Sequence, residues 1–302
     1  MYGAGSGVIR LSFCVLTFMA LLPRQLLAHG SNQRCDSLAR AFEEAPVIDR
    51  ELIVRDPATQ NWDDPVFKSM EASVQKSLRY FDQVLWSPGS MRLDEGSFKQ
   101  EFSRWMDESH RLSNYSKGAY HAALLPGVRR DRGRYAAWIP KSRRAGAVAY
   151  FDRVASESGI GPMIEGALPV RGISDQDQPA NFRDGRHLYP HPSAVGAYVD
   201  LAAGYLFRIR ALIKRGDAAR ARSLIGHYYH VLVNAHPYEN VNNSLFANQM
   251  VHLLRLTGHP GVSHGDLDHL LMRMSSEQVD LFWPRVLEGK VKNAAGCGIQ
   301  IK

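Results

Sequence analysis

Cysteine is scarce in this chain, with three residues in 302. Cys14 lies in an N-terminal apolar run, and Cys35 and Cys297 lie near the two ends. None of them has the CxxC spacing of zinc ribbons and redox motifs, which argues against those classes. In an oxidising compartment Cys35 and Cys297 would be able to pair, and the alternative is two free thiols. The motif HExxH is also absent, which argues against zinc proteases of that type.

Long apolar runs are lacking as well. The apolar run at the N-terminus covers only residues 11–22, whereas a membrane-spanning helix needs about 20 residues. Its length and position, after Arg10 and before Pro23, are typical of a secretory leader. We expect a leader over 1–28, cleaved after Ala28, and a secreted or periplasmic protein with no stable membrane span afterwards. An uncleaved anchor and a wrongly assigned start codon are the alternatives.

The chain has no strong imbalance of charge. Its formal net charge is +7, and the mature chain would carry less because the leader holds Arg10 and Arg24 and no acid. No aromatic-interleaved basic motif is present, so we expect no nucleic-acid partner. The densest basic clusters lie at 129–134 and 141–144. A solvated loop is the simpler interpretation of them, and a rim for a phosphate-bearing or acidic partner is the other.

Apolar residues recur at helical spacing over much of the chain, so we predict a mainly α-helical protein. Steps of three or four residues place apolar side chains on one face of a helix. The pattern predicts a helical N-terminal region over 29–118 and further helices in the second half of the chain. The individual segments are 67–85, 98–112, 193–215, 218–233, a helix ending near 256, and 275–287.

Residues 125–187 differ from the rest because proline and glycine interrupt them repeatedly. Short apolar pieces at Tyr135–Ile139 and Ala147–Phe151 predict strands or a hairpin. Long irregular segments of this kind are often functional lids. We therefore expect a loop or β-hairpin flap in this region.

One loop combines a histidine, a carboxylate and three asparagines between two predicted helices, His236-Pro237-Tyr238-Glu239-Asn240-Val241-Asn242-Asn243-Ser244. The backbone N–H groups at the start of a helix favour phosphate, because the positive end of the helix dipole lies there. A histidine beside bound phosphate can remove a proton from an incoming hydroxyl. A neighbouring carboxylate is a ligand for magnesium. The loop thus contains the parts of a phosphoryl or nucleotidyl transfer site.

This region resembles the Fic/Doc (Fido) family, whose signature is H-P-F-x-[DE]-G-N-G-R. The resemblance runs from the lead-in Tyr189-Pro190-His191-Pro192 through the His-Pro-aromatic loop to Gly258-His259-Pro260. It implies an α-helical core with a β-hairpin flap, here a domain over 119–290 followed by a tail over 291–302. It also implies transfer of AMP from ATP, with magnesium, to a hydroxyl of a target protein. Other members of the family use other phosphate-containing donors.

Residue by residue, the resemblance makes His236 the general base and Tyr238 the buried aromatic residue of the loop. Asn240 stands where the family has its metal-binding acid, with Glu239 beside it. Val241 replaces a glycine that lets the backbone wrap phosphate. Asn243 replaces a second glycine, and Ser244 replaces the phosphate-contacting arginine. We expect His236 to act as the base and Glu239 to be a weak metal ligand, with the donor held by Asn240, Asn242, Asn243 and Ser244.

Two alternatives remain open at this stage. The first is a catalytically inactive Fic-fold protein that binds a partner in the same groove. The second is a metal-dependent hydrolase that uses His227, His230 and His236, since a spacing of three places two imidazoles on one helix face. The leader favours a secreted effector or toxin as the role of an active enzyme, because ATP is scarce outside cells.

Overall fold

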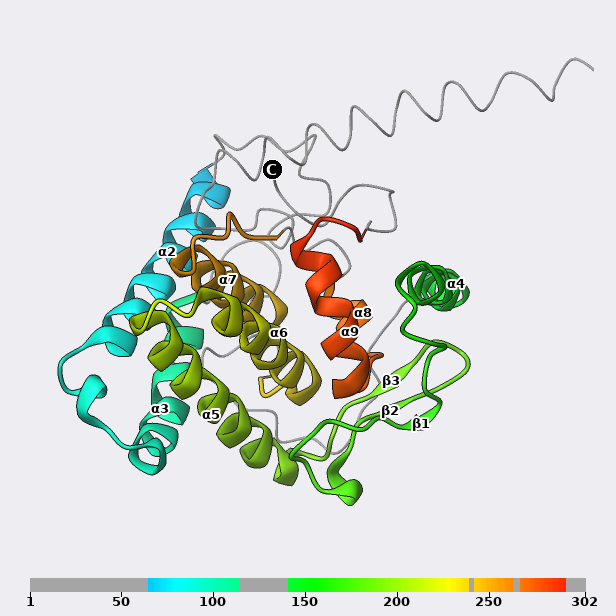
Figure 1. Cartoon of the computed structure of the whole chain (residues 1–302), viewed down its shortest axis with the longest axis horizontal. Helices are drawn as coiled ribbons and strands as arrows, with labels where there is room; N and C mark the ends of the chain where they lie inside the picture. The colour runs from blue at the N-terminus through cyan, green and yellow to red at the C-terminus, as the bar shows by residue number, and fades with distance from the viewer. Residues whose placement is uncertain (1–64, 114–140, 239–241, 263–266, 292–302) are drawn as a thin grey trace, which may run out of the picture.

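The computed structural model describes residues 65–113, 141–238, 242–262 and 267–291 (Figure 1). It shows a mainly helical protein with one small antiparallel sheet, as the sequence predicts. Within these ranges no helix is both long enough and apolar enough to cross a membrane. Several predictions fall outside the described residues: the leader over 1–28, the two end cysteines Cys35 and Cys297, the strand at Tyr135–Ile139 and nearly all of the tail.

The described helices are α2 (Pro65–Trp86), α3 (Glu95–Ser113), α4 (Lys141–Ser158), α5 (Val195–Lys214), α6 (Ala218–Ala235), α7 (Asn242–Leu256), α8 (Leu267–Leu271) and α9 (Ser276–Leu287). The strands are β1 (Gly166–Ala167), β2 (Ala180–Asn181) and β3 (His187–Leu188). Short 3-10 turns lie at 90–92, 175–177 and 192–194. The helices predicted for the described residues are therefore all present, with ends that differ by a few residues.

Local capping explains several of the helix ends. The Asp217 side chain accepts a hydrogen bond from the Arg220 backbone N–H at 3.3 Å and starts α6. Ser275 and Gln278 form a capping box at the start of α9. The helix predicted from residue 193 begins at Val195, because a 3-10 turn precedes α5, and His191 caps that turn by accepting the Ser193 N–H.

The sequence predicted a strand or hairpin at Ala147–Phe151. This prediction is wrong, because the segment is part of helix α4. Phe151, Val154 and Ala155 are almost fully buried, with exposures of 0%, 2% and 2%. Their spacing of three and four residues is helical. A short apolar run does not distinguish a strand from a buried helix by itself, and here the contacts of α4 with α9 decide the conformation.

The sheet has the order β1-β2-β3, and both pairings are antiparallel. In the β2–β3 hairpin Asn181 faces His187 and Ala180 faces Leu188. The turn is closed by hydrogen bonds from the Phe182 N–H to the Arg186 carbonyl and from the Gly185 N–H to the Phe182 carbonyl. The expected hairpin is thus present, at the end of the proline- and glycine-rich region that leads into Tyr189.

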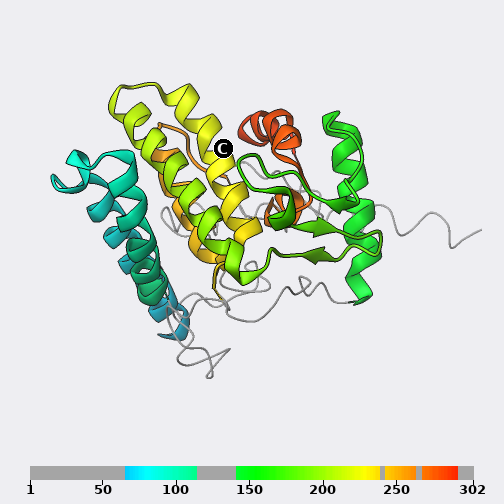
Figure 2. The ribbon, with the colours of Figure 1, turned by 90° about the horizontal axis from the view of Figure 1, so that it is seen from below.

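The helices form a group in which α5 and α6 pack side by side and α7 packs on α6. Figures 1 and 2 show the α2–α3 pair on one side of this group and α9, the sheet and α4 on the other. One hydrophobic core runs through these layers from Phe81 to Val291. The predicted domain boundary near residue 118 stays a prediction, and the described residues on both sides of it share this core.

Helix α9 approaches α6 closely because Gly226 has no side chain. A Cβ atom at this position would lie 2.5 Å from Cγ of Trp283. The Trp283 indole N–H also donates to the Arg222 carbonyl at 2.8 Å. The ring therefore lies flat against the α6 backbone and fixes the position of α9.

We predict that Gly226→Ala lowers the free energy of unfolding by about 1 to 3 kcal/mol, because the methyl group must displace a buried ring. Gly196→Ala is the matched control, since Gly196 is an exposed helical glycine with nothing within 4 Å of the added Cβ. The control is expected to be neutral or to stabilise by up to about 1 kcal/mol through helix propensity. Urea unfolding of both variants is the measurement, and equal stabilities would contradict the close-packing argument.

Candidate functional site

His236 lies where helix α6 ends and the chain turns toward α7. Its backbone is left-handed, with φ 43° and ψ 59°, and its N–H donates to the Leu232 carbonyl at 3.1 Å. Among the described residues it is the only non-glycine with positive φ. A left-handed conformation costs such a residue about 1 to 2 kcal/mol. Strain of this kind is concentrated at functional sites, which supports the choice of His236 as the central residue.

Tyr238 anchors the loop to helix α3. Its side chain is fully buried, and its ring stacks on His110 with centroids 3.9 Å apart. The phenol hydroxyl donates to Oδ1 of Asp107 at 2.9 Å. The hydroxyl that distinguishes this residue from the phenylalanine of the resembling family therefore has a partner, and the aromatic residue is buried as predicted.

Asn242 closes the loop with a two-way amide clamp. Its Oδ1 accepts the Tyr238 N–H at 2.8 Å, and its Nδ2 donates to the Tyr238 carbonyl, also at 2.8 Å. The side chain is buried at 1% exposure. The amide group is therefore used within the loop, where it fixes the start of α7. Its expected contact with a donor stays a prediction, and it would have to come from the backbone N–H.

The other predicted donor-binding residues are only partly described. Glu239 and Asn240 lie outside the described residues. The backbone of Asn243 and Ser244 forms the first turn of α7, and their side chains are not described. The first four N–H groups of a helix have no acceptor within it and carry the positive end of the dipole. The backbone at the start of α7 is therefore chemically suited to phosphate, beside the partly exposed His236.

An aromatic ring that sequence reasoning did not place in the site covers one face of His236. Tyr189 stacks on the His236 imidazole with centroids 4.3 Å apart and an angle of 22° between the rings. Tyr189 is 3% exposed. It belongs to the lead-in Tyr189-Pro190-His191-Pro192, and that part of the resemblance is the signal that could have indicated it. The sequence did not predict the contact of Tyr189 with His236, which lies 47 positions later.

A buried arginine connects the hairpin turn to the segment between α8 and α9. Arg273 is 1% exposed, and its guanidinium donates to the Gly185 carbonyl in the hairpin turn and to the His269 carbonyl at 3.1 Å. Burial lowers the pKa of Arg273, although Tyr189 and Asp268 oppose this effect. Nothing in the local sequence marks this residue, because it lies between two short helices.

Two buried histidines surround the same region and are held neutral. Nδ1 of His187 lies 2.9 Å from Oδ1 of Asn181, and Nε2 of His230 lies 2.9 Å from the Met274 carbonyl. A carbonyl oxygen only accepts, so Nε2 of His230 carries the hydrogen. Burial, aided by the positive charge of Arg273, lowers the pKa of His187 well below its ordinary value. Burial lowers the pKa of His230 to about 4.

The histidines proposed as a metal site have other partners. His230 bonds the Met274 carbonyl, and Nε2 of His227 lies 2.6 Å from Oδ1 of Asp280. Within the part of the chain that the structure describes, no group of three or more His, Cys, Asp or Glu residues is arranged to hold a metal ion. The described residues therefore do not form the three-histidine centre of the hydrolase alternative.

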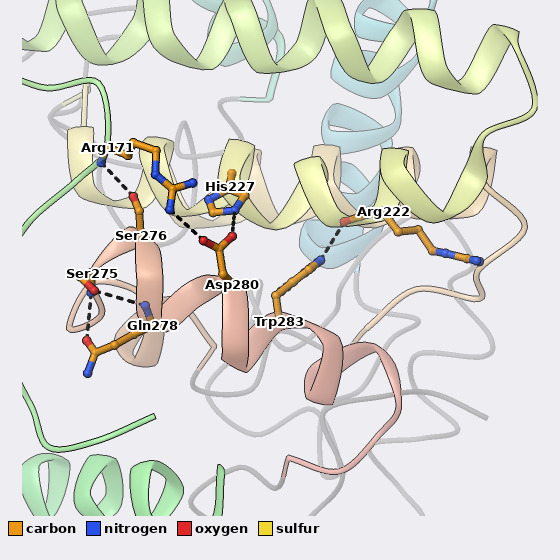
Figure 3. Close-up of polar contacts among 8 residues, drawn as sticks. All are labelled: Arg171, Arg222, His227, Ser275, Ser276, Gln278, Asp280 and Trp283. Atoms are coloured by element: carbon orange, nitrogen blue, oxygen red, sulfur yellow. Dashed lines mark hydrogen bonds and ion pairs between the residues drawn. The ribbon is translucent and has the colours of Figure 1, made fainter. Parts of the chain in front are cut away.

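A second polar cluster joins α6, α9 and the segment after β1 (Figure 3). Asp280 lies between His227 and Arg171, which donates to its Oδ2 at 2.8 Å. The Arg171 N–H also donates to Oγ of Ser276 at 2.9 Å. Burial opposes the charge on Asp280, but the hydrogen bonds from Arg171 and His227 together lower its pKa. The cluster joins the segment after β1 to helices α6 and α9.

We predict that Asn242→Ala lowers the free energy of unfolding by about 1 to 2 kcal/mol, as for the loss of a helix cap. The physical reason is the loss of both hydrogen bonds to the Tyr238 backbone. Amide hydrogen exchange at Tyr238 is the direct measurement and is expected to accelerate. Unchanged exchange at that amide would contradict the clamp.

Acid is predicted to destabilise the protein through His230. The pKa of His230 is about 4 in the folded chain, against 6.5 ordinarily. Between these values only the unfolded chain binds the proton, so stability falls as the pH falls through this window. At about 1.4 kcal/mol for each pH unit, the loss is about 3 kcal/mol.

Stability measured by urea unfolding from pH 7 to pH 4 checks this prediction, with His230→Gln as the comparison. Glutamine keeps an N–H donor for the Met274 carbonyl and does not titrate. The variant is expected to show a shallower dependence of stability on pH. The same dependence in both proteins would refute a neutral buried His230.

The chain was also compared with known proteins. No protein-family model matches it, and no curated protein does. The likeness to the Fic/Doc family therefore depends on the residues of the His236 loop, its lead-in and the helix that follows.

Proposed function

We propose that this protein transfers AMP, or another phosphate-linked group, from a nucleotide-type donor to a hydroxyl of a target protein. The observation that carries the proposal is the geometry at His236. His236 is a partly exposed residue in a left-handed helix cap, and it precedes a helix of 15 residues in the chain. This arrangement supports the proposal, because His236 precedes the start of α7 by six residues and a helix N-terminus is chemically suited to phosphate.

In this proposal His236 accepts the proton of the target hydroxyl as its oxygen attacks the phosphorus of the donor. A new oxygen–phosphorus bond forms, and the bond from that phosphorus to the leaving group breaks. With ATP as donor the leaving group is pyrophosphate and the product carries AMP. His236 then releases the proton to solvent or to the leaving group, which restores the neutral imidazole.

The backbone N–H groups of Asn243, Ser244 and the residue after them would bind the donor's phosphates, helped by the dipole of α7. Tyr238 and Asn242 act indirectly, since they fix the loop against α3 and set the direction of the first turn. Arg273 contributes a buried positive charge that interacts electrostatically with Tyr189.

Magnesium would neutralise charge on the donor's phosphates when bound. Glu239 is the residue with the right chemistry to hold it, and the neutral amide of Asn240 is a poorer ligand. Both lie outside the described residues. In this proposal His236 accepts the proton itself, and the metal takes no part in that transfer.

The expected leader extends the proposal to location. A secreted or periplasmic transferase meets little ATP there, so we propose an effector or toxin that acts inside another cell or uses a different donor. The target would be a protein, because a free hydroxyl on a side chain is the acceptor.

One observation favours a second candidate, a binding protein without catalysis. The Asn242 amide is committed to the loop, and Val241 and Asn243 stand where the resembling family has glycines. A backbone with side chains at these positions wraps phosphate less readily.

The test is transfer of label to protein acceptors from nucleotides labelled at the α-phosphorus or, separately, at the γ-phosphorus. Label from the α position alone indicates transfer of AMP, and label from the γ position indicates phosphoryl transfer. His236→Ala is expected to lower the rate by about a hundredfold or more, as for loss of a general base.

His252→Ala is the matched control, because His252 is on α7 but pairs with Asp82 at 2.9 Å on the α2 side. It is expected to keep the wild-type rate. If neither wild type nor His236→Ala transfers label from several donors, but both bind the same partner equally, the binding candidate replaces the transferase.

A further inference from the structure

The β2–β3 hairpin is fastened to the helical core by side chains on both strands and in the turn. Asn181 and His187 face each other across the hairpin, and Oδ1 of Asn181 lies 2.9 Å from Nδ1 of His187. Nδ2 of Asn181 donates to the Arg273 carbonyl at 3.2 Å, and the Arg273 guanidinium donates to the Gly185 carbonyl. The hairpin therefore has a fixed position relative to the segment between α8 and α9.

The two hydrogen bonds of Asn181 also fix the orientation of His187. Because Nδ2 is the donor to the Arg273 carbonyl, Oδ1 is the acceptor that faces His187. Nδ1 of His187 therefore carries the hydrogen. Asn181 and His187 are both fully buried, at 0% exposure. The His187 ring is thus held by a hydrogen bond and by close packing.

A series of three rings leads from this fixed point to the candidate base. The His187 and Tyr189 rings meet edge to face, with centroids 5.0 Å apart and planes at 77°. The Tyr189 ring then stacks on His236 at 4.3 Å and 22°. Tyr189 follows β3 directly and precedes a proline, which restricts its backbone to extended conformations. Its ring is therefore held between a buried edge and the His236 imidazole.

The stack limits what the His236 side chain can do. The left-handed backbone of His236 and the following Pro237 fix the direction of the His236 Cα–Cβ bond. These two constraints do not restrict rotation about χ1 and χ2 of His236. A ring stacked nearly parallel on one face gains dispersion only in a narrow range of those rotations. A general base needs such a restriction, because it must meet the proton within hydrogen-bond distance.

We propose that Tyr189 is a positioning residue for His236, and that the Asn181–His187 pair holds Tyr189 in place. The hairpin thereby controls the direction in which the His236 imidazole points. The catalytic meaning of this arrangement rests on the proposed transferase function. The geometric claim itself, an imidazole held by the Tyr189 ring, is measurable in a protein without activity.

If Tyr189 were only a core residue, substitutions at this position would have different effects from those expected for a positioning residue. Tyr189 also packs against buried Met272, so any apolar side chain of similar size would satisfy a core position. Only a flat ring would satisfy the stacking role. The phenol hydroxyl lies within electrostatic reach of Arg273, and the comparison of Tyr189→Phe with Tyr189→Leu separates the ring from the hydroxyl.

The first experiment uses the wild-type full chain with labelled histidine and tyrosine. Nuclear Overhauser contacts are expected between the ring protons of Tyr189 and His236, and the His236 ring signals are expected upfield because of the ring current. Absence of both would overturn the proposal. No variant has to fold for this result.

The second experiment compares Tyr189→Phe and Tyr189→Leu, with folding checked by thermal unfolding. Tyr189→Phe is expected to keep the His236 signals and the rate at which diethyl pyrocarbonate modifies His236. Tyr189→Leu is expected to move the signals downfield and to accelerate modification several-fold, with the modified residue identified by mass spectrometry. Asn181→Ala is expected to act in the same direction with a smaller effect. Equal behaviour of Phe and Leu at position 189 would overturn the proposal.

Activity supplies a separate outcome. Where label transfer occurs, Tyr189→Leu is expected to lower kcat by about tenfold to a hundredfold with little change in KM for the donor, as for a misplaced base. Tyr189→Phe is expected to restore kcat. If no variant transfers label while the spectroscopic and modification results hold, the proposed function fails and the positioning role stands. If transfer occurs but Tyr189→Leu equals wild type in all readouts, the positioning role fails alone.

Discussion

The burial of helix α6 is the constraint on which the rest of the structure depends. From Ile225 to Ala235 every residue of this helix is buried. A buried polar group costs free energy unless it has a hydrogen-bond partner, so the polar residues of this stretch select what packs around them. His227 is hydrogen-bonded to Asp280 of α9, and His230 is hydrogen-bonded to the Met274 carbonyl just before α9. Together with the Trp283 ring on Gly226, these contacts fix α9 and leave His236 at the end of a rigid helix.

The candidate site is built from the end of one buried helix and the start of another. The left-handed turn at His236 redirects the chain, Tyr238 fixes it to α3, and the Asn242 clamp aims the N-terminus of α7. These contacts occupy polar groups that would be available to bind phosphate in a simple phosphate-binding loop. The described part of the loop is therefore held by its own side chains to a greater degree than glycine-rich loops, and the backbone at the start of α7 is chemically suited to an anion.

The hairpin and the helical core meet at the same histidine. Arg273 and Asn181 attach the hairpin to the segment before α9, and Tyr189 extends from the hairpin onto His236. The Arg171–Asp280–His227 cluster attaches the beginning of the sheet segment to the same two helices, α6 and α9. Two independent sets of polar contacts thus place an irregular, proline- and glycine-rich segment against a helical scaffold, as a rigid flap requires.

The sequence by itself determined the mainly helical class and most of the described helices, and it singled out the His236 loop as the candidate site. These features depend on residues within one or two turns of each other, which is why periodicity and capping patterns reveal them. Tertiary structure alone decided that Ala147–Phe151 is helical, that the Asn242 amide is used within the loop, and that His187, Tyr189 and Arg273 surround His236. Each of these depends on buried contacts between segments distant in sequence, or on geometry that residue order does not specify. Packing and the need to pair buried polar groups select such contacts only when the whole chain is folded.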